Sequence, residues 1–532
     1  MSSLDPRTPV IVGVGQVTNR PDPDPDAELV GRPEPVELMV TALLQAVEDC
    51  DESGPGGTSP AGCALLRRTD SIRVIPPFNW DYRDPASLVA KRLSIEPKEL
   101  ALTTNGGNNP QLTVNQTALA IGRGQLDSAL IVGADCGYTA AAVRTHPDRP
   151  VLGWTVEPPG GDQPMVIGTA RRGTTDAEEA SGIGVPGHVF PLFENALRAE
   201  AGRSLAEHDE LMGRLWSRFS QVAAGHPNAW ITDSCSGEDI ISISESNRMV
   251  SFPYPKLLTG NTRVDQGAAL IMCSAAAAEA AGVPRDRWVF PLAGADAIDH
   301  WYLSHRADFH SSPAARLAGR SAMALAGTDT DSIGHLDLYS YFPAAVEVVA
   351  HELGVAIDDE ARPLTVTGGQ TFFGTPGSNY GTHAIATMVG ALRQDSGSLG
   401  MVTNIGLNMT MHSLGIYGTE PGAPTPDPGV VPENTAVEEA AGFRWADPQP
   451  AVDALPQCSP DADAAGEVTV ETYTVTYDRD GAPDRAIVAC KTPEGRRAWA
   501  NVTDQDQLAV LVTEEGCGRL GKLRSDGQVD LR

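Results

Sequence analysis

The sequence predicts an α/β protein made of two similar halves, followed by a small all-β domain. The first observation is a repeated order of elements: a turn rich in glycine and asparagine, an amphipathic helix, a short link and a buried strand. The second is a segment at 467–477 in which apolar and polar residues alternate. This period of two is typical of an antiparallel strand with one exposed face.

The first half opens with a strand at residues 10–15, a β-branched run that ends in glycines. Its most informative segment is the turn at 104–110, where Asn109 suits a helix N-cap and Pro110 suits the first helical position. A helix through Ile121 and a buried strand at 126–133 are expected to follow.

The second half repeats this plan. A turn at 374–381 precedes a helix that runs through His383 to Leu392, and a buried strand follows at 399–406. Two such units would direct two helix N-termini, with their partial positive charge, at one shared cleft.

Composition divides the chain into parts. Residues 1–275 are expected to form the first half, with an irregular loop subdomain inserted at about 150–240, and residues 276–420 the second half. The segment 421–440 is predicted as a proline-rich linker. Residues 441–532 are expected to form a small β-barrel similar to the oligonucleotide/oligosaccharide-binding (OB) fold.

Charge and composition exclude several classes of partner. The formal net charge of −30 opposes binding to nucleic acid. No apolar stretch reaches the roughly 18 residues needed to span a membrane. The 8 cysteines form no CxxC pair, so no metal site is expected, and their scatter is typical of a reducing compartment. The N-terminus has no signal segment, and we expect a cytoplasmic location.

Several segments resemble the thiolase superfamily in their order and spacing. Residues 248–255, followed by 264–269, are similar to the end of the family's first half. Residues 336–342 resemble the segment that ends in a phenylalanine near the active site, and 368–376 resemble the Gly-Gly…Gly-His-Pro segment. The resemblance covers about residues 8–420 and is nearest to sterol-carrier-type thiolases and thiolase-like proteins of type 1. It implies the five-layered αβαβα thiolase fold.

The resemblance also implies an altered catalytic centre. Thiolases use a nucleophilic cysteine at a helix N-terminus, an activating histidine, a second cysteine, and an asparagine or histidine in the oxyanion hole. These four positions fall on Gly107, Thr375, Asn404 and Tyr339. A glycine offers no nucleophile, so cysteine-dependent thiolysis or condensation is not expected.

Other side chains in this scaffold are candidates for catalysis. The phenols of Tyr339 and Tyr380 are candidate acids, bases or oxyanion donors, and His383 is a candidate replacement for the missing histidine. Asn404 completes the candidate set. The alternative roles are core packing for the tyrosines, a satisfied buried histidine, and an asparagine that satisfies buried backbone.

The backbone amides of the two turns form a candidate anion or oxyanion cradle, with plain helix capping as the alternative. The residues assigned to this ligand-binding role are Gly106, Gly107, Asn108, Asn109, Gly377 and Ser378. Arg171, Arg172 and Lys256 are candidates for contacting coenzyme A phosphates, and a solvated surface role is the alternative.

The resemblance therefore implies a protein of lipid metabolism that binds coenzyme A or acyl-CoA as a ligand, with no covalently bound cofactor. Similarity alone would label it an acetyl-CoA acetyltransferase. Two alternatives stay open. One is a retro-aldol lyase acting on β-hydroxyacyl-CoA, in which Tyr339 or Tyr380 deprotonates the β-hydroxyl; the other is a non-catalytic carrier of acyl-CoA or lipid. Whether the protein is an enzyme, and whether it is a monomer or a homodimer, stays open as well.

Overall fold

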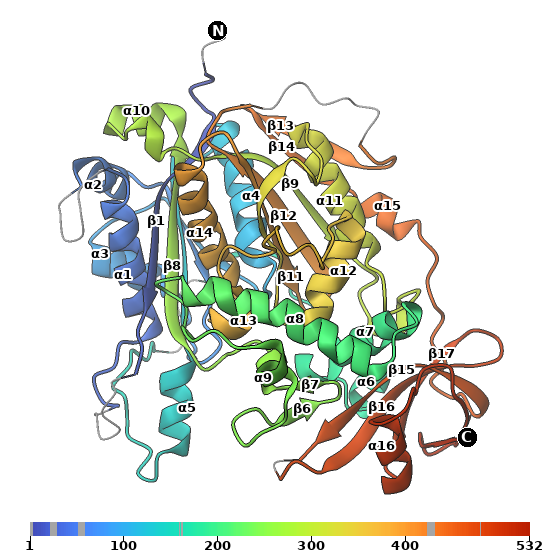
Figure 1. Cartoon of the computed structure of the whole chain (residues 1–532). Coiled ribbons are helices and arrows are strands. Elements are labelled where there is room, and N and C mark those ends of the chain that lie inside the picture. The colour runs from blue at the N-terminus through green and yellow to red at the C-terminus, as the bar shows by residue number, and fades with distance from the viewer. Residues whose placement is uncertain are drawn as a thin grey trace.

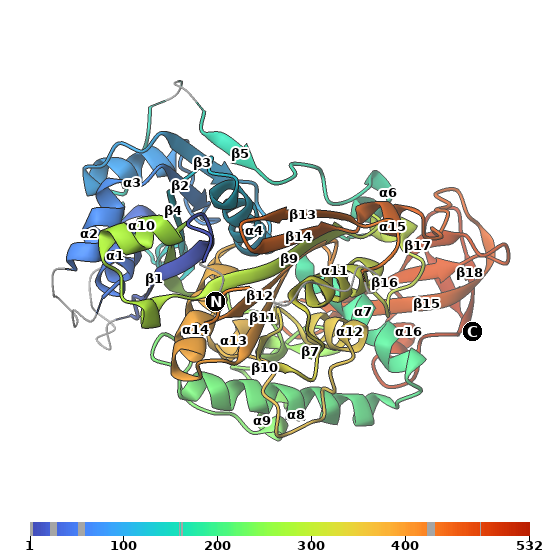
Figure 2. The same cartoon turned by 90° about the horizontal axis from the view of Figure 1, so that it is seen from above.

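The computed structural model describes residues 4–21, 29–51, 59–158, 160, 163–422, 431–478 and 480–532. Figure 1 shows two β-sheets with helices between them and on their outer faces, and a further β unit near the C-terminus. Seen from above in Figure 2, the first half, the second half and this β unit follow one another across the molecule. Part of the predicted linker, 423–430, lies outside the described residues.

The first sheet has the strand order β1-β8-β4-β2-β3-β5. Its strands are β1 (Pro9–Thr18), β2 (Ser71–Ile75), β3 (Glu99–Thr103), β4 (Ser128–Cys136), β5 (Met165–Ile167) and β8 (Asp265–Ser274). β8 runs antiparallel to both β1 and β4, whereas β2, β3 and β5 continue from β4 in parallel. β4 and β8 are buried along their whole length, as expected for strands covered on both faces.

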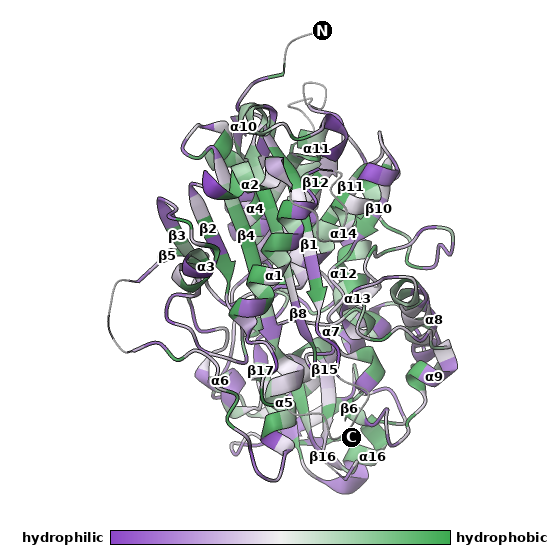
Figure 3. Cartoon of the chain, turned by 90° about the vertical axis from the view of Figure 1, so that its left-hand side faces the viewer, coloured by the Kyte–Doolittle hydropathy of each residue, from purple (hydrophilic) through white to green (hydrophobic). Residues whose placement is uncertain are grey.

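Four helices lie on the outer side of the first sheet: α1 (Pro35–Glu48), α2 (Pro60–Arg67), α3 (Pro85–Leu93) and α10 (Ala275–Ala281). α1 begins where Glu34 and Glu37 form a capping box, and its buried stripe packs on β1, β8 and β4. Figure 3 shows the resulting band of hydrophobic residues along β1, β4 and α1.

The second sheet has the strand order β10-β11-β12-β9-β14-β13. Its strands are β9 (Phe290–Ile298), β10 (Ile333–Asp337), β11 (Leu399–Gly406), β12 (Met411–Gly418), β13 (Ala436–Ala440) and β14 (Phe443–Asp447). The helix α11 (Pro313–Ala326) packs on its outer face, and α12 (Pro343–Leu353) packs beside α11.

Residues 436–447 differ from the prediction, which divided them between the linker and the added β domain. They form the β13–β14 hairpin, and β14 pairs in parallel with β9, so they belong to the second sheet. Phe443 is fully buried there, and Ala440 packs against Gly122. The physical reason for the error is that β13 is mostly exposed and acidic, and so lacks an alternating apolar pattern.

Two helices form the central layer between the sheets: α4 (Asn109–Gly122) and α14 (Tyr380–Gln394). α4 is buried on almost every side, and several of its polar side chains bond one another or the neighbouring strands. Gln111 donates to Asn115 at 2.9 Å and accepts from Tyr417 at 2.7 Å, and Asn115 donates to Asp296 at 3.1 Å. The outer helices, two sheets and this central layer are the five layers that the resemblance predicted.

The inserted segment is more regular than predicted. Within the range 150–240 it contains α6 (Asp176–Ala180), α7 (Pro186–Glu200), α8 (Leu205–Ala224) and α9 (Gly237–Ile241). The prediction of irregular structure is wrong for α7 and α8, two of the longer helices in the described chain. The signals were present: Pro186 begins α7, and Ser204 with Glu207 forms a capping box before the amphipathic α8.

The C-terminal unit is a small closed barrel. Its elements are β15 (Gly466–Tyr477), β16 (Pro483–Lys491), β17 (Arg497–Val502), α16 (Gln505–Leu511), β18 (Leu520–Leu523) and β19 (Val529–Leu531). The strand order is β17-β16-β15-β18-β19, and a parallel bridge between Asn501 and Gln528 joins the two ends. This connectivity, with a helix between the third and fourth strands, is that of the predicted OB-like barrel.

The barrel is docked through buried polar contacts. Arg497 is fully buried, bonds both carboxylate oxygens of Glu471 at 2.6 and 2.7 Å, and donates to the carbonyls of Leu303 and Ser304. On α7, Arg198 forms an ion pair with Glu515 of the barrel, with one contact at 2.9 Å. Among helices of the described residues, none has the length and apolarity to cross a bilayer.

Candidate functional site

The two glycine- and asparagine-rich turns meet at the centre of the molecule, as the sequence predicted for a shared cleft. The amide of Gly106 donates to Ser378 Oγ at 3.0 Å, which joins the first turn directly to the second. Asn404, at the end of β11, accepts from the amide of Gln111 in the first turn of α4 at 3.2 Å. A Cβ on Gly381 of α14 would lie only 2.0 Å from Asn404 Oδ1, so this asparagine lies between both helix N-termini.

Gly107, which the resemblance aligns with the family's nucleophile, lies against Tyr339. A Cβ on Gly107 would lie 2.0 Å from Tyr339 Oη and 2.5 Å from the carbonyl oxygen of Ile405. The phenol therefore fills the space that a side chain at position 107 would need. Burial raises the pKa of Tyr339, so its hydroxyl is protonated at neutral pH and has a proton to donate in a hydrogen bond.

Tyr380 is placed differently from Tyr339, although their rings meet edge to face at 5.8 Å. Its hydroxyl lies 2.7 Å from Thr367 Oγ1 and donates to Asp337 Oδ1 at 2.9 Å. Burial raises the pKa of both Tyr380 and Asp337. Because both of these partners are buried protein groups, the Tyr380 hydroxyl has a structural role in this arrangement.

His383 lies inside α14 and faces β1. Its Nδ1 is 2.9 Å from Gln16 Oε1, and its ring packs against Phe373. Burial lowers its pKa to about 3, so the imidazole is neutral. Among the described residues it makes no hydrogen bond to Gly107 or Tyr339. Thr375, which the resemblance aligns with the family's histidine, donates its hydroxyl to Gln370 O at 3.0 Å.

Several buried polar atoms around the turns have no hydrogen-bond partner in the described chain. They are Asn108 Oδ1, Asn109 Oδ1, Asn379 Oδ1 and both amide atoms of Gln370. Asn109 and Asn379 each use their amide nitrogen, on Thr104 and Gly133 respectively. An unsatisfied buried polar group costs about 1–3 kcal/mol, so a cluster of them indicates a functional site rather than plain packing.

A pocket of about 530 Å³, here called the α5 pocket, opens beside this centre. The helix α5 (Gly137–Thr145) and the segment 256–263 form its walls, and its lining includes Tyr138, Trp230 and Lys256. Its inner wall is backed by Tyr341 and by Thr375, which the resemblance aligns with the family's histidine. A Cβ on Gly260 would lie 2.1 Å from the Tyr341 ring and 2.9 Å from Thr375 Oγ1.

The hydrogen bonds of this inner wall run directly into the catalytic segments. Gly260 donates to the carbonyl of Tyr341 at 2.8 Å, and Asn261 donates to that of Gln370 at 3.0 Å. Thr375 in turn donates its amide to Asn261 O at 2.8 Å. Arg263, on the outer rim, is a candidate that sequence reasoning missed, because no local motif marks it.

The basic candidates of the sequence are separated by the fold. Lys256 lines the α5 pocket, whereas Arg171 lines a second pocket of about 490 Å³ that also contains Asn105 of the first turn. Arg171 stacks over the rings of Trp301 and Tyr302 at 4.9 Å. Arg172 forms ion pairs with two carboxylates of α6, so it is engaged within the protein.

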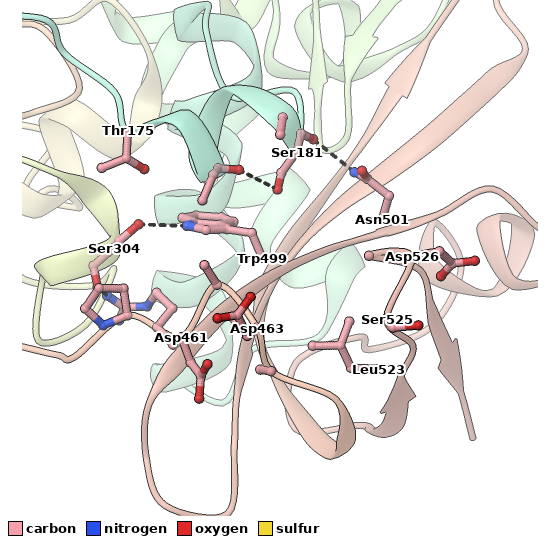
Figure 4. A pocket seen from close by; sticks show the side chains of 18 of the residues that line it. Thr175, Ser181, Ser304, Asp461, Asp463, Trp499, Asn501, Leu523, Ser525 and Asp526 are labelled. Carbon is pink, nitrogen blue, oxygen red and sulfur yellow. Dashed lines mark hydrogen bonds between the residues drawn. The ribbon is translucent and has the colours of Figure 1, made fainter.

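A third pocket, also about 530 Å³, lies where the barrel meets α6 and the segment around Ser304 (Figure 4). Trp499 donates to Ser304 Oγ at 2.9 Å, and Asn501 donates to Ser181 O at 3.0 Å. None of its lining residues belongs to either catalytic turn.

Comparison with known proteins agrees with this architecture. The family model described as "Thiolase-like protein type 1 additional C-terminal domain" matches residues 447–528. A monomeric SCP2-thiolase-like protein type 1 from Mycobacterium smegmatis has a TM-score of 0.79 and 29% identity, with 99% of each chain covered. Over almost its whole length the chain is therefore similar to thiolase-like proteins of type 1. Its barrel is the additional C-terminal domain of that group.

More distant structures share the fold of this thiolase-like protein. The Ltp2–ChsH2(DUF35) aldolase matches with a TM-score of 0.57 and 20% identity, covering 78% of this chain and 98% of the other. The Acat5 thiolase from Ascaris suum, solved in complex with coenzyme A, matches with a TM-score of 0.54 and 14% identity, covering 77% and 99%. A search of curated proteins gives no match.

Proposed function

We propose that this thiolase-like protein binds coenzyme A thioesters of lipid metabolism in the α5 pocket and does not carry out cysteine-dependent thiolysis. The observation that carries the proposal is the exchange at the nucleophile position. Gly107 has no side chain, and the Tyr339 hydroxyl occupies the space that a cysteine there would fill.

The charge of the α5 pocket supports an anionic ligand. Lys256 and Arg263 are exposed at its rim, and neither forms an ion pair with a carboxylate of the described residues. In a protein of net charge −30, two free cations at one pocket form a local site for phosphate groups. Arginine and lysine both donate several hydrogen bonds to phosphate oxygens.

The aromatic side chains of the pocket support a nucleotide as part of that ligand. The rings of Tyr138 and Trp230 lie 5.6 Å apart with an angle of 48° between them, and both are half-buried. An adenine ring stacks favourably on such faces. Coenzyme A combines phosphates, an adenine and a long arm that carries the thioester. The wall at Gly260 lies between the pocket and the residues Thr375 and Tyr341.

Isothermal titration with coenzyme A and acetyl-CoA tests the proposal. We expect saturable binding to the wild-type protein, and at least about tenfold weaker binding after Lys256→Ala combined with Arg263→Ala, because each lost charge-assisted contact is worth about 1.5 kcal/mol or more. Lys522→Ala is the matched control, since this lysine is exposed on the barrel. No binding at millimolar ligand, or equal weakening by the control, would refute the proposal.

A second candidate function is retro-aldol cleavage of a β-hydroxyacyl-CoA. The observation that favours it is the position of a tyrosine hydroxyl directly at the Gly107 turn. In this reaction the phenolate form of Tyr339 accepts the proton of the β-hydroxyl as the Cα–Cβ bond breaks. Because burial raises the pKa of the phenol, this form and the reaction are favoured by rising pH. The electron pair passes to the thioester as an enolate, whose oxygen the turn amides hold, and a proton then adds at Cα. The products are an aldehyde or ketone and a shortened acyl-CoA.

The two functions separate in a turnover assay. Release of an aldehyde or ketone from a β-hydroxyacyl-CoA, lost in Tyr339→Phe but kept in Tyr380→Phe, would establish the retro-aldol reaction. Tight binding without turnover of any acyl-CoA would instead favour a carrier. Thiolysis of acetoacetyl-CoA by the wild-type protein would contradict the assignment of Gly107 to the nucleophile position.

A further inference from the structure

Three helices bring together a buried cluster that belongs to neither catalytic turn. Glu194 of α7, His208 of α8 and Glu347 of α12 have side chains that are 0%, 1% and 4% exposed. His208 Nε2 lies 2.5 Å from Glu194 Oε1 and 4.0 Å from Glu347 Oε1. One nitrogen and two carboxylate oxygens, one from each residue, all lie within 4.8 Å of one another.

One atom of this cluster is left without a partner. No donor in the described chain hydrogen-bonds Glu347 Oε1, although it is buried and faces both the histidine and the Glu194 carboxyl. The other oxygen, Oε2, lies 3.6 Å from the guanidinium of Arg203. A buried carboxylate with a free lone pair is costly, and two such groups side by side repel each other unless a cation or a shared proton compensates them.

We propose that Glu194, His208 and Glu347 form a binding site for one divalent cation of the zinc type. One imidazole nitrogen and two carboxylate oxygens are a donor set that zinc accepts, with bonds of about 2.0–2.2 Å and a tetrahedral arrangement. Such bonds place ligand atoms about 3.3 Å apart. Glu194 Oε1 and His208 Nε2 would separate by less than about 1 Å, and Glu347 would close by a similar amount.

The surroundings fit a metal centre. The Tyr254 hydroxyl bonds the second oxygen of Glu194, which fixes the orientation of that carboxylate. A pocket of about 420 Å³, lined by Arg203, His351 and Glu347 itself, gives an ion and a fourth ligand such as water a path to the cluster. Arg203 lies 3.4 Å from His208 Nδ1 and is about one-third exposed, so it can turn outward when a cation enters.

The position of the cluster indicates what the cation would do. α7 carries the contact with the added domain, through Asn195, which donates to Tyr473 O at 2.9 Å. α12 begins at Pro343, four residues after Tyr339. A cation held by both helices would therefore join the docking surface of the barrel to the segment that carries the cleft tyrosine, and this role is structural.

Metal binding is measured on the full chain, expressed without a polyhistidine tag and stripped with a chelator. Titration with Zn²⁺ is expected to give one tight site per chain, with a rise in melting temperature. Co²⁺ in its place should give the visible absorption of a low-symmetry, four-coordinate site. Glu347→Gln and His208→Gln are each expected to weaken Zn²⁺ binding by about tenfold or more, because each removes one of three ligands.

His351→Ala is the matched control, because this histidine lies on the same helix and lines the same pocket but is not part of the cluster. It should leave the stoichiometry and affinity unchanged. If His208→Gln does not fold, Glu347→Gln and the Co²⁺ spectrum of the wild-type protein decide the question alone. Absence of Zn²⁺ and Mn²⁺ binding by the wild-type chain, or loss of binding in His351→Ala with retention in Glu347→Gln, would overturn the proposal.

Discussion

Gly107→Ala is the substitution that most directly tests the exchange between the nucleophile and Tyr339. The added methyl carbon would lie 2.0 Å from the phenol oxygen and 2.5 Å from the carbonyl oxygen of Ile405, whereas ordinary contacts begin at about 3.4 Å. Two atoms must therefore move by roughly 1 Å, and one of them is strand backbone. Overpacking costs about 1–3 kcal/mol, and we expect a loss near the upper end of that range in the free energy of unfolding.

A double-mutant cycle separates the contribution of the phenol. Tyr339→Leu removes the hydroxyl and the ring, so Gly107→Ala should cost less in that background than in the wild type. We expect a coupling energy of about 1 kcal/mol or more, measured by urea unfolding. Gly173→Ala is the matched control, because a Cβ there would meet nothing closer than 3.7 Å. Additivity of Gly107→Ala and Tyr339→Leu within about 0.5 kcal/mol would refute the inferred contact.

Three further predictions follow from buried groups. Burial lowers the pKa of His383 to about 3 in the folded protein, against 6.5 when unfolded, so the free energy of unfolding should fall as pH drops below 6.5 and level off near pH 3. His383→Gln should reduce this pH dependence by up to about 1.4 kcal/mol per pH unit in urea-unfolding measurements. An unchanged pH dependence would contradict a buried neutral imidazole. Arg497→Met removes the guanidinium that bonds Glu471 and the carbonyls of Leu303 and Ser304, and it leaves Glu471 with only Lys491 at 3.5 Å. It should cost about 1.5–3 kcal/mol, seen as faster proteolytic release of the barrel. The exposed-site control Arg7→Met should not change the release rate, and equal rates for the two variants would show that the contact does not hold the domain. Gly107→Cys should not restore thiolysis of acetoacetyl-CoA, because Tyr339 fills the space that the cysteine side chain needs and Thr375 supplies no base. The assay measures loss of the substrate absorbance. A normal thiolase rate would show that neither the occupied space nor the missing base prevents the reaction.

The fold could be predicted largely because it is repeated. The turn at 104–110 and the turn at 374–381 each precede a helix and a buried strand, and the structure places these as α4 with β4 and α14 with β11. The long insertion could not be derived in the same way. Its helices α7 and α8 follow a stretch dense in glycine and proline, and that composition obscured the capping signals at Ser204 and Glu207.

The candidate site was predicted at the level of segments but not of contacts. The resemblance aligned Gly107 with the family's nucleophile and Tyr339 with its oxyanion-hole side chain. The two residues are 232 positions apart, and no local pattern shows that the Tyr339 hydroxyl fills the space beside Gly107. The same limit applies to Glu194, His208 and Glu347, which come from three helices. Only the packing of α7, α8 and α12 brings them within coordination distance.

Exchanges at the positions that the resemblance aligns with catalytic residues are each supported by neighbouring residues, which argues against a thiolase disabled at one residue. The phenol of Tyr339 fits only because position 107 is glycine, and the contact of Asn404 with Gly381 fits only because position 381 is glycine. Asn404 also accepts from the amide of Gln111, so it caps the helix whose N-terminus would otherwise activate a nucleophile. A return to cysteine chemistry would require Tyr339 to leave, Asn404 to be replaced and Thr375 to become a base together. Coordinated replacement of this kind is what retention of the cleft for a different use would produce, and it explains why unsatisfied asparagine oxygens persist there at a cost in stability.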